Sequence, residues 1–296
     1  MTDSLFSWDQ ISPGDRLRPI EYEITPPVHE SFLISAAATP ELTRLLIDDR
    51  GRSVAHPMQT LTDYSALIQQ RYGPMGSGLH ARHESTLLRP IPLDTPLTAE
   101  GSVVDKFVKR GRDYWIADYS VSDQEGVLVR HRMTSTIDRA ENSAEPESSS
   151  STPESTPTPR PQRTGATGPE DWTCHLTREI TLPMIIDYDR QYWLRHGEAF
   201  RNAPNAHTSP EIARAAGLRD AVAHSSHYYG WLANVALQTY GPSWLYGGTL
   251  EARFVAPLFP GDTIAVESSE QPPGLRLRVV GDDGIVFATG TAASNS

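Results

Sequence analysis

Cysteine and lysine are almost absent from this chain of 296 residues. Cys174 is the single cysteine, which excludes an internal disulfide framework and a metal site built from several cysteines. Lys106 and Lys109 are the two lysines, so arginine supplies nearly all the positive charge. Acidic residues outnumber basic ones by 37 to 26, and the formal net charge is −11. This balance argues against a nucleic-acid-binding protein, because phosphate contacts need clustered lysine and arginine.

Long apolar runs are also missing. No stretch approaches the ~18 apolar residues of a membrane-spanning helix. The first ten residues, MTDSLFSWDQ, lack the basic and apolar regions of a secretory signal. We therefore expect a soluble cytoplasmic protein.

The composition changes abruptly in residues 139–170, which include the stretch ENSAEPESSSSTPESTPTPRPQRTGATGPE. Serine, threonine, proline and glutamate dominate there, and almost no side chain is apolar. Such a segment cannot bury enough surface to offset the chain entropy lost on ordering. We expect a disordered linker between an N-terminal domain, residues 1–138, and a C-terminal domain, residues 171–296.

The two expected domains carry the same motifs in the same order. Each has the tripeptide Val-Ala-His, at 54–56 and at 222–224, directly before an apolar segment of helix length. Each later has alternating apolar and polar residues around a hairpin signal, a Glu-Gly pair ending at Gly126 or an Asp-Gly pair ending at Gly284. Two copies indicate a duplicated domain and not a solenoid. The pattern predicts an α+β fold with one buried helix for each antiparallel sheet.

The second half resembles the MaoC-like dehydratase family, which includes the R-specific enoyl-CoA hydratases. The resemblance is carried by Asn202 and His207, by a short helix ending at Gly217, by Ala-His-Ser at 223–225 and by Pro-Gly-Asp at 260–262. It implies a tandem, or double, hot-dog fold, in which two antiparallel sheets are each wrapped around a central helix. Two departures stand out. The family's aspartate is replaced by asparagine, as in a subgroup similar to the mesaconyl-CoA hydratases, and the family's Ala-His-Gly ends here in serine.

The resemblance implies hydration or dehydration of an enoyl or 3-hydroxyacyl thioester by the C-terminal half. His207 would move the proton, because a histidine titrates near neutral pH. Asn202 would position the water or the leaving hydroxyl, although its amide cannot take a proton. Ser225 would donate its backbone N–H to the thioester oxygen, because the first N–H groups of a helix have no partner within it. Carboxylates nearby in sequence that could share the proton transfer are Asp187, Asp189 and Glu198.

Three more residues at the start of the central helix are candidates for substrate binding: His224, His227 and Tyr228. Each also has a structural interpretation. His224 has a counterpart, His56, at the same place in the N-terminal half, and the other two residues suit a packed core. His207 itself could be an ordinary loop residue beside a helix cap at Thr208 or Ser209. A metal held by two histidines of this helix has no supporting ligand motif, so we expect neither a metal nor a redox cofactor.

The first half lacks the proposed chemistry. Pro57 stands at the position of Ser225 and has no N–H to donate. Thr39 and Ile34 stand at the positions of the candidate histidine and asparagine. We expect this half to be a non-catalytic partner that helps to shape the acyl site.

Several alternatives stay open from sequence. The thioester carrier could be coenzyme A or an acyl-carrier protein, and the acidic chain favours coenzyme A. The protein could instead be an isomerase or cyclase of specialised metabolism on the same fold, or a ligand-binding protein whose catalytic site has decayed. The acyl chain, the direction of the reaction and the oligomeric state, with a homodimer as one option, are not encoded in any motif.

Overall fold

The computed structural model describes residues 6–73, 78–137, 171–196 and 205–294. The expected linker and Asn202 lie outside the described residues. None of the helices in these ranges combines the length and the apolar character that crossing a bilayer requires.

The N-terminal half contains short helices and long strands. Its helical segments are η1 (Trp8–Gln10), α1 (Pro26–Ser35), α2 (Pro40–Thr43), η2 (Pro57–Thr60) and α3 (Asp63–Tyr72). Its strands are β1 (Ile20–Tyr22), β2 (Val54–Ala55), β3 (His80–Leu87), β4 (Ile91–Pro92), β5 (Leu97–Lys109), β6 (Arg112–Asp123) and β7 (Gly126–Thr136).

The C-terminal half repeats this plan with a longer central helix. Its helical segments are α4 (Leu182–His196), α5 (Pro210–Ala215), α6 (Ser225–Tyr240) and η4 (Gly241–Tyr246). Its strands are β8 (Thr173–Glu179), β9 (Thr249–Phe254), β10 (Thr263–Gln271), β11 (Gly274–Gly281) and β12 (Val286–Ala293).

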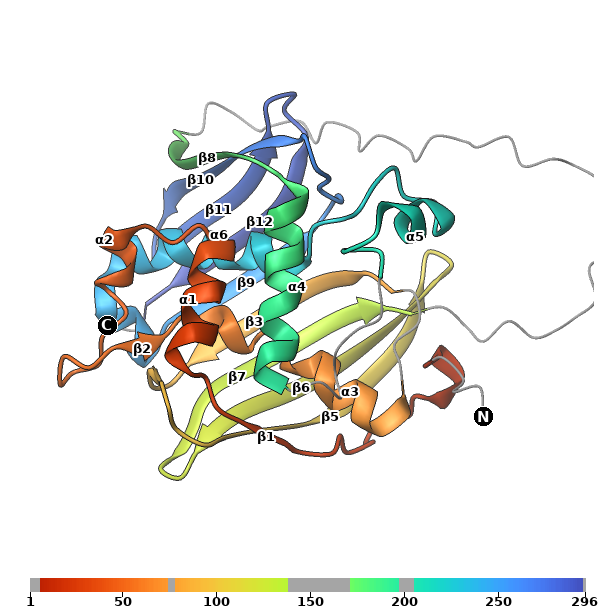
Figure 1. Cartoon of the computed structure of the whole chain (residues 1–296), viewed down its shortest axis with the longest axis horizontal. Helices are drawn as coiled ribbons and strands as arrows, with labels where there is room; N and C mark the ends of the chain where they lie inside the picture. Colours follow the sequence, from red (N-terminus) through yellow and green to blue (C-terminus); the bar gives the residue numbers. More distant parts are fainter. Residues whose placement is uncertain (1–5, 74–77, 138–170, 197–204, 295–296) are drawn as a thin grey trace, which may run out of the picture.

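Ten strands form one continuous antiparallel sheet in the order β1-β5-β6-β7-β3-β9-β12-β11-β10-β8. The order is the same in each half when read from the middle outward, which supports a duplicated domain. Strands β3 and β9 join the halves, with Ser85 opposite Leu250. The α+β hot-dog class is confirmed, and the two expected sheets meet edge to edge as a single sheet (Figure 1).

Both predicted hairpins are present. One joins β6 to β7 and the other joins β11 to β12. Gly126 and Gly284 have φ angles of +126° and +79°, in the region that only glycine adopts without strain. The sequence therefore located both turns correctly.

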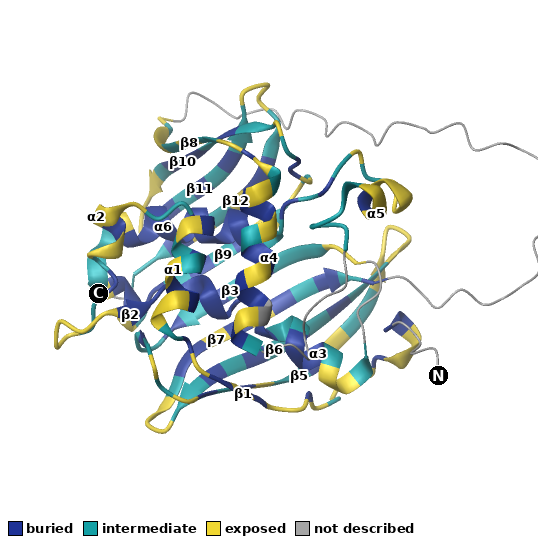
Figure 2. Ribbon diagram, viewed as in Figure 1, coloured by how far each residue is buried: buried dark blue, intermediate teal, exposed yellow. Residues whose placement is uncertain are grey.

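The core lies between the sheet and the helices that cover one of its faces (Figure 2). Inward residues of each strand alternate with outward ones, as in β6, where Trp115 and Ala117 are fully buried. Helix α6 is buried from Ser226 through Leu237 and packs against β9 to β12. In the N-terminal half the corresponding segment is split into η2 and α3 and does not form one long helix.

Helix α4 fastens the two halves together. It runs beside α1, as Figure 1 shows, and its last turn reaches the start of α3. There, Arg195 donates from Nη2 to Oδ1 of Asp63 over 2.7 Å, and His196 Nε2 lies 3.1 Å from the same oxygen. Tyr22 donates its hydroxyl proton to the other carboxylate oxygen. These side chains are buried, so the carboxylate charge is neutralised inside the protein.

Candidate active site

His207 lies in a tight loop that hydrogen bonds fix from both sides. The side-chain oxygen of Asn205 accepts from the backbone N–H of His207 at 2.8 Å and of Thr208 at 3.2 Å. Ser209 then caps α5 by accepting from the N–H of Ile212 at 3.3 Å. Helix α5 ends at Ala215, and Gly217, two residues later, turns the chain with a φ of +81° that favours glycine. The predicted cap, short helix and terminating glycine are all in place.

The geometry assigns the tautomer of His207. Its Nδ1 lies 2.7 Å from the carbonyl oxygen of Val222, and a carbonyl can only accept, so Nδ1 carries the proton. Removal of the ring from water, helped by the neighbouring His224, lowers the pKa of His207 to about 3. The imidazole is therefore neutral at pH 7, and its Nε2 keeps a free lone pair. That nitrogen is in the unprotonated form that a general base requires.

The ring of His224 stacks on the ring of His207, with centroids 3.6 Å apart and planes 22° from parallel. His224 is the residue directly before α6, and its Nε2 lies 3.5 Å from Oδ1 of Asp189 on α4. The same oxygen is 3.4 Å from the amide nitrogen of Asn205. The sequence motifs thus meet at one point, between the start of α6 and the middle of α4.

Asp189 is buried and ionised at neutral pH. Burial acts to raise the pKa of its carboxyl group, but the contacts with His224, His207 and Asn205 outweigh burial and lower the pKa. A negative charge therefore stands beside the two stacked imidazoles. It would stabilise an imidazolium if either ring took up a proton.

Ser225 is the first residue of α6, a helix of 16 residues. Its backbone N–H is one of the groups that a helix leaves without an internal acceptor, and the helix dipole favours negative charge at this end. Its side-chain oxygen lies 2.8 Å from Nδ1 of His80, which belongs to β3 of the other half. The side chain is half-buried.

The other two predicted substrate-binding residues lie in the packed interior. His227 is fully buried between Tyr188 and Trp231, at ring-centroid distances of 4.5 and 5.9 Å. Tyr228 is 2 % exposed and donates to the carbonyl of Ala256 over 3.1 Å. These positions favour the structural interpretation of both, and their contact with substrate stays a prediction.

Sequence reasoning did not single out two of the groups that form this site. Asn205 was not among the candidate residues, although asparagine side chains often hydrogen-bond the backbone two residues on and so signal a turn. His80 belongs to the half without a site, and no local pattern connects it to Ser225. Asp189 was one of three open carboxylates, and the fold places it beside His224.

The counterpart positions in the N-terminal half have structural roles. His56 is fully buried, accepts from the N–H of Met58 at 3.2 Å, and its Nε2 lies 3.0 Å from the amide oxygen of Asn234 on α6. Thr39, the counterpart of His207, caps α2 through a 3.2 Å bond from the N–H of Leu42. Pro57 begins η2. No proton carrier therefore takes the place of His207 in this half among the residues that align with it.

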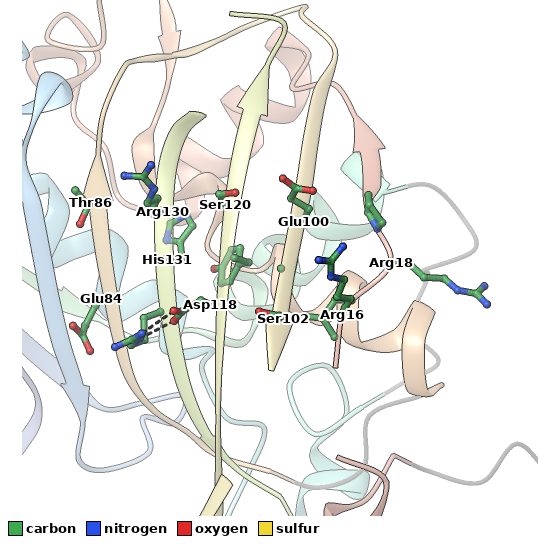
Figure 3. A pocket seen from close by; sticks show the side chains of 15 residues that line it. Arg16, Arg18, Glu84, Thr86, Glu100, Ser102, Asp118, Ser120, Arg130 and His131 are labelled. Carbon is green, nitrogen blue, oxygen red and sulfur yellow. Dashed lines mark hydrogen bonds and ion pairs between the residues drawn. The ribbon is translucent and has the colours of Figure 1, made fainter. Parts of the chain in front are cut away.

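A cavity of about 940 Å³ lies away from this site, on the N-terminal half (Figure 3). Residues of β3, β5, β6 and β7 and of the segment 16–19 line it, and among them Arg132 and Asp118 form a bidentate pair with two 2.7 Å bonds. None of the site residues above belongs to its lining. Within the described ranges, no group of three or more histidine, cysteine, aspartate or glutamate side chains is arranged to hold a metal ion.

Comparison with protein families matches residues 204–274 to the MaoC like domain. This range contains His207, Ser225 and the start of β11. The match confirms the resemblance to MaoC-like proteins, while the subgroup with asparagine stays a prediction. No curated protein matches the sequence.

Solved structures of low sequence identity share the fold. A MaoC-like dehydratase from Phytophthora capsici has a TM-score of 0.68 at 15% identity, with 95% of each chain covered. The peroxisomal multifunctional enzyme type 2 of Drosophila melanogaster has a TM-score of 0.67 at 16% identity, and the match covers 95% of this chain but 48% of the fly protein. A Mycobacterium tuberculosis protein described as a double hotdog fold has a TM-score of 0.63 at 11% identity, with 98% of each chain covered.

Proposed function

We propose that the protein is a hydratase or dehydratase of acyl thioesters with its active site in the C-terminal half, because residues 204–274 match the MaoC like domain and a solved double hot-dog structure shares the fold. The observation that carries the proposal is the fixed tautomer of His207. The Val222 carbonyl holds the proton on Nδ1 and leaves Nε2 as a base beside the first turn of α6. The reaction needs such a base next to donors for the thioester oxygen.

The proposed roles follow the chemistry of syn elimination or addition of water. During dehydration His207 Nε2 takes the proton from the α-carbon and passes it to the departing hydroxyl, which leaves as water. During hydration it takes a proton from the attacking water and delivers it to the α-carbon. Asp189 stabilises the imidazolium formed in that step, with His224 stacked between them. The backbone N–H of Ser225 binds the thioester oxygen as it gains negative charge. Asn202 stays the proposed group for positioning water.

The carrier of the acyl group is proposed to be coenzyme A. The chain has a net charge of −11 and two lysines, which does not favour docking of an acidic carrier protein. The N-terminal half, with Pro57 and Thr39 in the counterpart positions, is proposed to be a scaffold without its own reaction.

The test is turnover of trans-2-butenoyl-CoA followed by mass spectrometry. We expect the substrate to gain the mass of one water, and 3-hydroxybutyryl-CoA to lose it in the reverse assay. His207→Gln should lower kcat by at least about 100-fold, the contribution typical of a positioned general base. His175→Gln, at an exposed histidine on β8, should leave kcat unchanged.

Other outcomes identify the alternatives. Product of unchanged mass would indicate an isomerase or cyclase. Binding of the thioester without any turnover, unaffected by His207→Gln, would indicate a ligand-binding protein. Either result would contradict the proposed hydro-lyase function.

A further inference from the structure

A line of polar groups runs from the half-buried start of α6 into the buried interior of the N-terminal half. Ser225 Oγ lies 2.8 Å from His80 Nδ1, His80 Nε2 lies 3.1 Å from His83 Nδ1, and His83 Nε2 lies 3.1 Å from His131 Nδ1. His131 Nε2 ends the line 3.0 Å from the hydroxyl of Thr60. These groups come from α6, β3, β7 and η2, so the line crosses the seam between the halves.

The three imidazoles each carry one proton at neutral pH. Burial lowers the pKa of His80 and of His131 to about 3, and it lowers the pKa of His83 well below the ordinary value. A neutral imidazole donates from one nitrogen and accepts at the other. The direction of every bond in the line is therefore set once one of them is known.

A backbone carbonyl sets that direction. Tyr229 Oη lies 2.6 Å from the carbonyl oxygen of Leu250 and 2.9 Å from Ser85 Oγ. The phenol has one proton and the carbonyl can only accept, so the proton of Tyr229 belongs to the bond with Leu250. Ser85 must then donate its own proton to the oxygen of Tyr229. Because the Ser85 hydroxyl has no second proton to donate, its oxygen accepts a hydrogen bond from His131 Nδ1, which lies 2.8 Å away.

The rest follows by proton counting. With its proton on Nδ1, His131 accepts at Nε2 from the Thr60 hydroxyl at 3.0 Å, a closer partner for that hydroxyl than the Pro57 carbonyl at 3.5 Å. Two N–H groups cannot face each other, so His83 Nε2 carries no proton. His83 therefore donates from Nδ1 to His80 Nε2, and His80 donates from Nδ1 to Ser225 Oγ. The Ser225 oxygen accepts that bond, and its own proton is left to donate elsewhere.

We propose that the Ser225 hydroxyl is a second hydrogen-bond donor to the thioester oxygen, beside the backbone N–H of the same residue. His80 is the positioning residue that keeps the hydroxyl in its donor state. This role rests on the proposed function. It gives the N-terminal half a specific part in the reaction of the other half. It also assigns a function to the side chain of Ser225, at a position where the MaoC-like family has glycine.

The first test reads the tautomers directly and needs no activity. In ¹⁵N-labelled protein at pH 7.5, long-range ¹H–¹⁵N spectra should show His80, His83 and His131 with the proton on Nδ1. Single substitutions of each histidine assign the signals. A proton on Nε2 of His80 would overturn the donor state of Ser225.

The second test is a double-mutant cycle on hydration of trans-2-butenoyl-CoA. Ser225→Ala keeps the backbone N–H and removes the hydroxyl, and it should lower kcat about 100-fold, as loss of one such donor does. His80→Ala should lower kcat about 10-fold, in line with loss of a hydrogen bond to the donor. In the Ser225→Ala background, His80→Ala should cost nothing further, because coupled residues are not additive. His80→Asn, whose amide can donate from the place of Nδ1, should restore most of the activity.

The control is His175→Ala, which breaks another histidine–serine bond of 2.8 Å, to Ser268 at the far edge of the sheet. It should leave kcat unchanged. If His80 were only structural, its substitution would lower activity equally in both backgrounds, and that result would overturn its positioning role. A wild-type protein with the inferred tautomers but no turnover would overturn the proposed function and the substrate contact together, leaving the hydrogen-bond assignment intact.

Discussion

Asp189 carries a buried negative charge whose nearest partners are the imidazole of His224 and the amide of Asn205. The carboxylate is 3.5 Å from His224 and 3.4 Å from Asn205, with no arginine or lysine among the partners found for it. A charge kept in such a place costs desolvation energy, which an imidazolium formed during turnover would offset. The arrangement is typical of a site that stabilises a transient cation.

Asp189→Asn tests that role. The asparagine keeps the shape of the side chain and can still accept from Asn205, but it removes the charge. We expect kcat for hydration of an enoyl-CoA to fall about 10-fold or more at pH 7.5, since each 1.36 kcal/mol of lost stabilisation is a factor of ten in rate. Asp187→Asn, on the same helix and half-buried, is the matched control and should stay within about twofold of wild type. Equal effects of the two substitutions would contradict an electrostatic role for Asp189.

At the same scale, the sequence predicted part of the site. The resemblance to the MaoC-like family pointed to His207 and Ser225, because the motifs that carry it are local: a short helix ending in glycine, and an Ala-His pair before a long helix. Asp189 and His80 depend on how α4 and β3 pack against α6, and no periodicity in the chain encodes that packing.

Among the elements, α4 shows how a helix can hold a site and the rest of the fold at once. Its middle places Asp189 beside the imidazoles, and its last turn inserts Arg195 against Asp63. Burial acts to raise the pKa of Asp63, but Arg195 and His196 outweigh it and lower the pKa. The ion pair is therefore present throughout the neutral range.

Arg195→Met should destabilise the protein strongly. Removing the guanidinium leaves the buried carboxylate of Asp63 without its main counter-charge, and breaking such a pair costs about 3–5 kcal/mol. We expect the free energy of unfolding in urea to fall by that amount. Arg190→Met, at an exposed position of the same helix, should change it by less than about 0.5 kcal/mol. If both variants unfold at the same urea concentration, the pair contributes nothing to docking of α4.

The elements themselves were largely predictable. Alternation and the two glycine turns located the long strands, and the apolar segment after 222–224 located α6. The split of its counterpart into η2 and α3 was not foreseen. Pro57 opens that segment, and Thr62, between the two pieces, has φ and ψ of −85° and 0°, outside the helical region. Tertiary contacts of η2 with α6 override the apolar pattern there.

For the whole molecule, the buried histidines dominate the response to acid. Burial lowers the pKa of His83 well below the ordinary value for a histidine. It lowers to about 3 the pKa values of five more histidines: His56, His80, His131, His207 and His227. In the unfolded chain each titrates near 6.5. The folded protein therefore binds fewer protons than the unfolded chain between these two values, and folding stability falls as the pH drops below 6.5.

We expect the free energy of unfolding to be flat above about pH 7 and to decrease steeply from pH 6.5 downward, by roughly 1.4 kcal/mol per pH unit for each histidine. Urea titrations at pH 7.5, 6.0 and 5.0 measure this slope. Phosphate and citrate buffers matched in ionic strength remove screening effects. A free energy of unfolding that stays constant from pH 7.5 to 5.0 would contradict the neutral, buried state of these rings.

The seam between β3 and β9 has a further consequence for how such proteins diverge. Main-chain amides and carbonyls make the pairing between strands, and these groups are the same whichever side chains the strands carry. Substitutions can therefore erase the chemistry of one copy without loosening its attachment to the other. In a duplicated domain joined in this way, one copy can lose its own site and remain as a scaffold. That scaffold can then gain a role toward the other copy, such as orienting a hydroxyl group, which a single domain could not have.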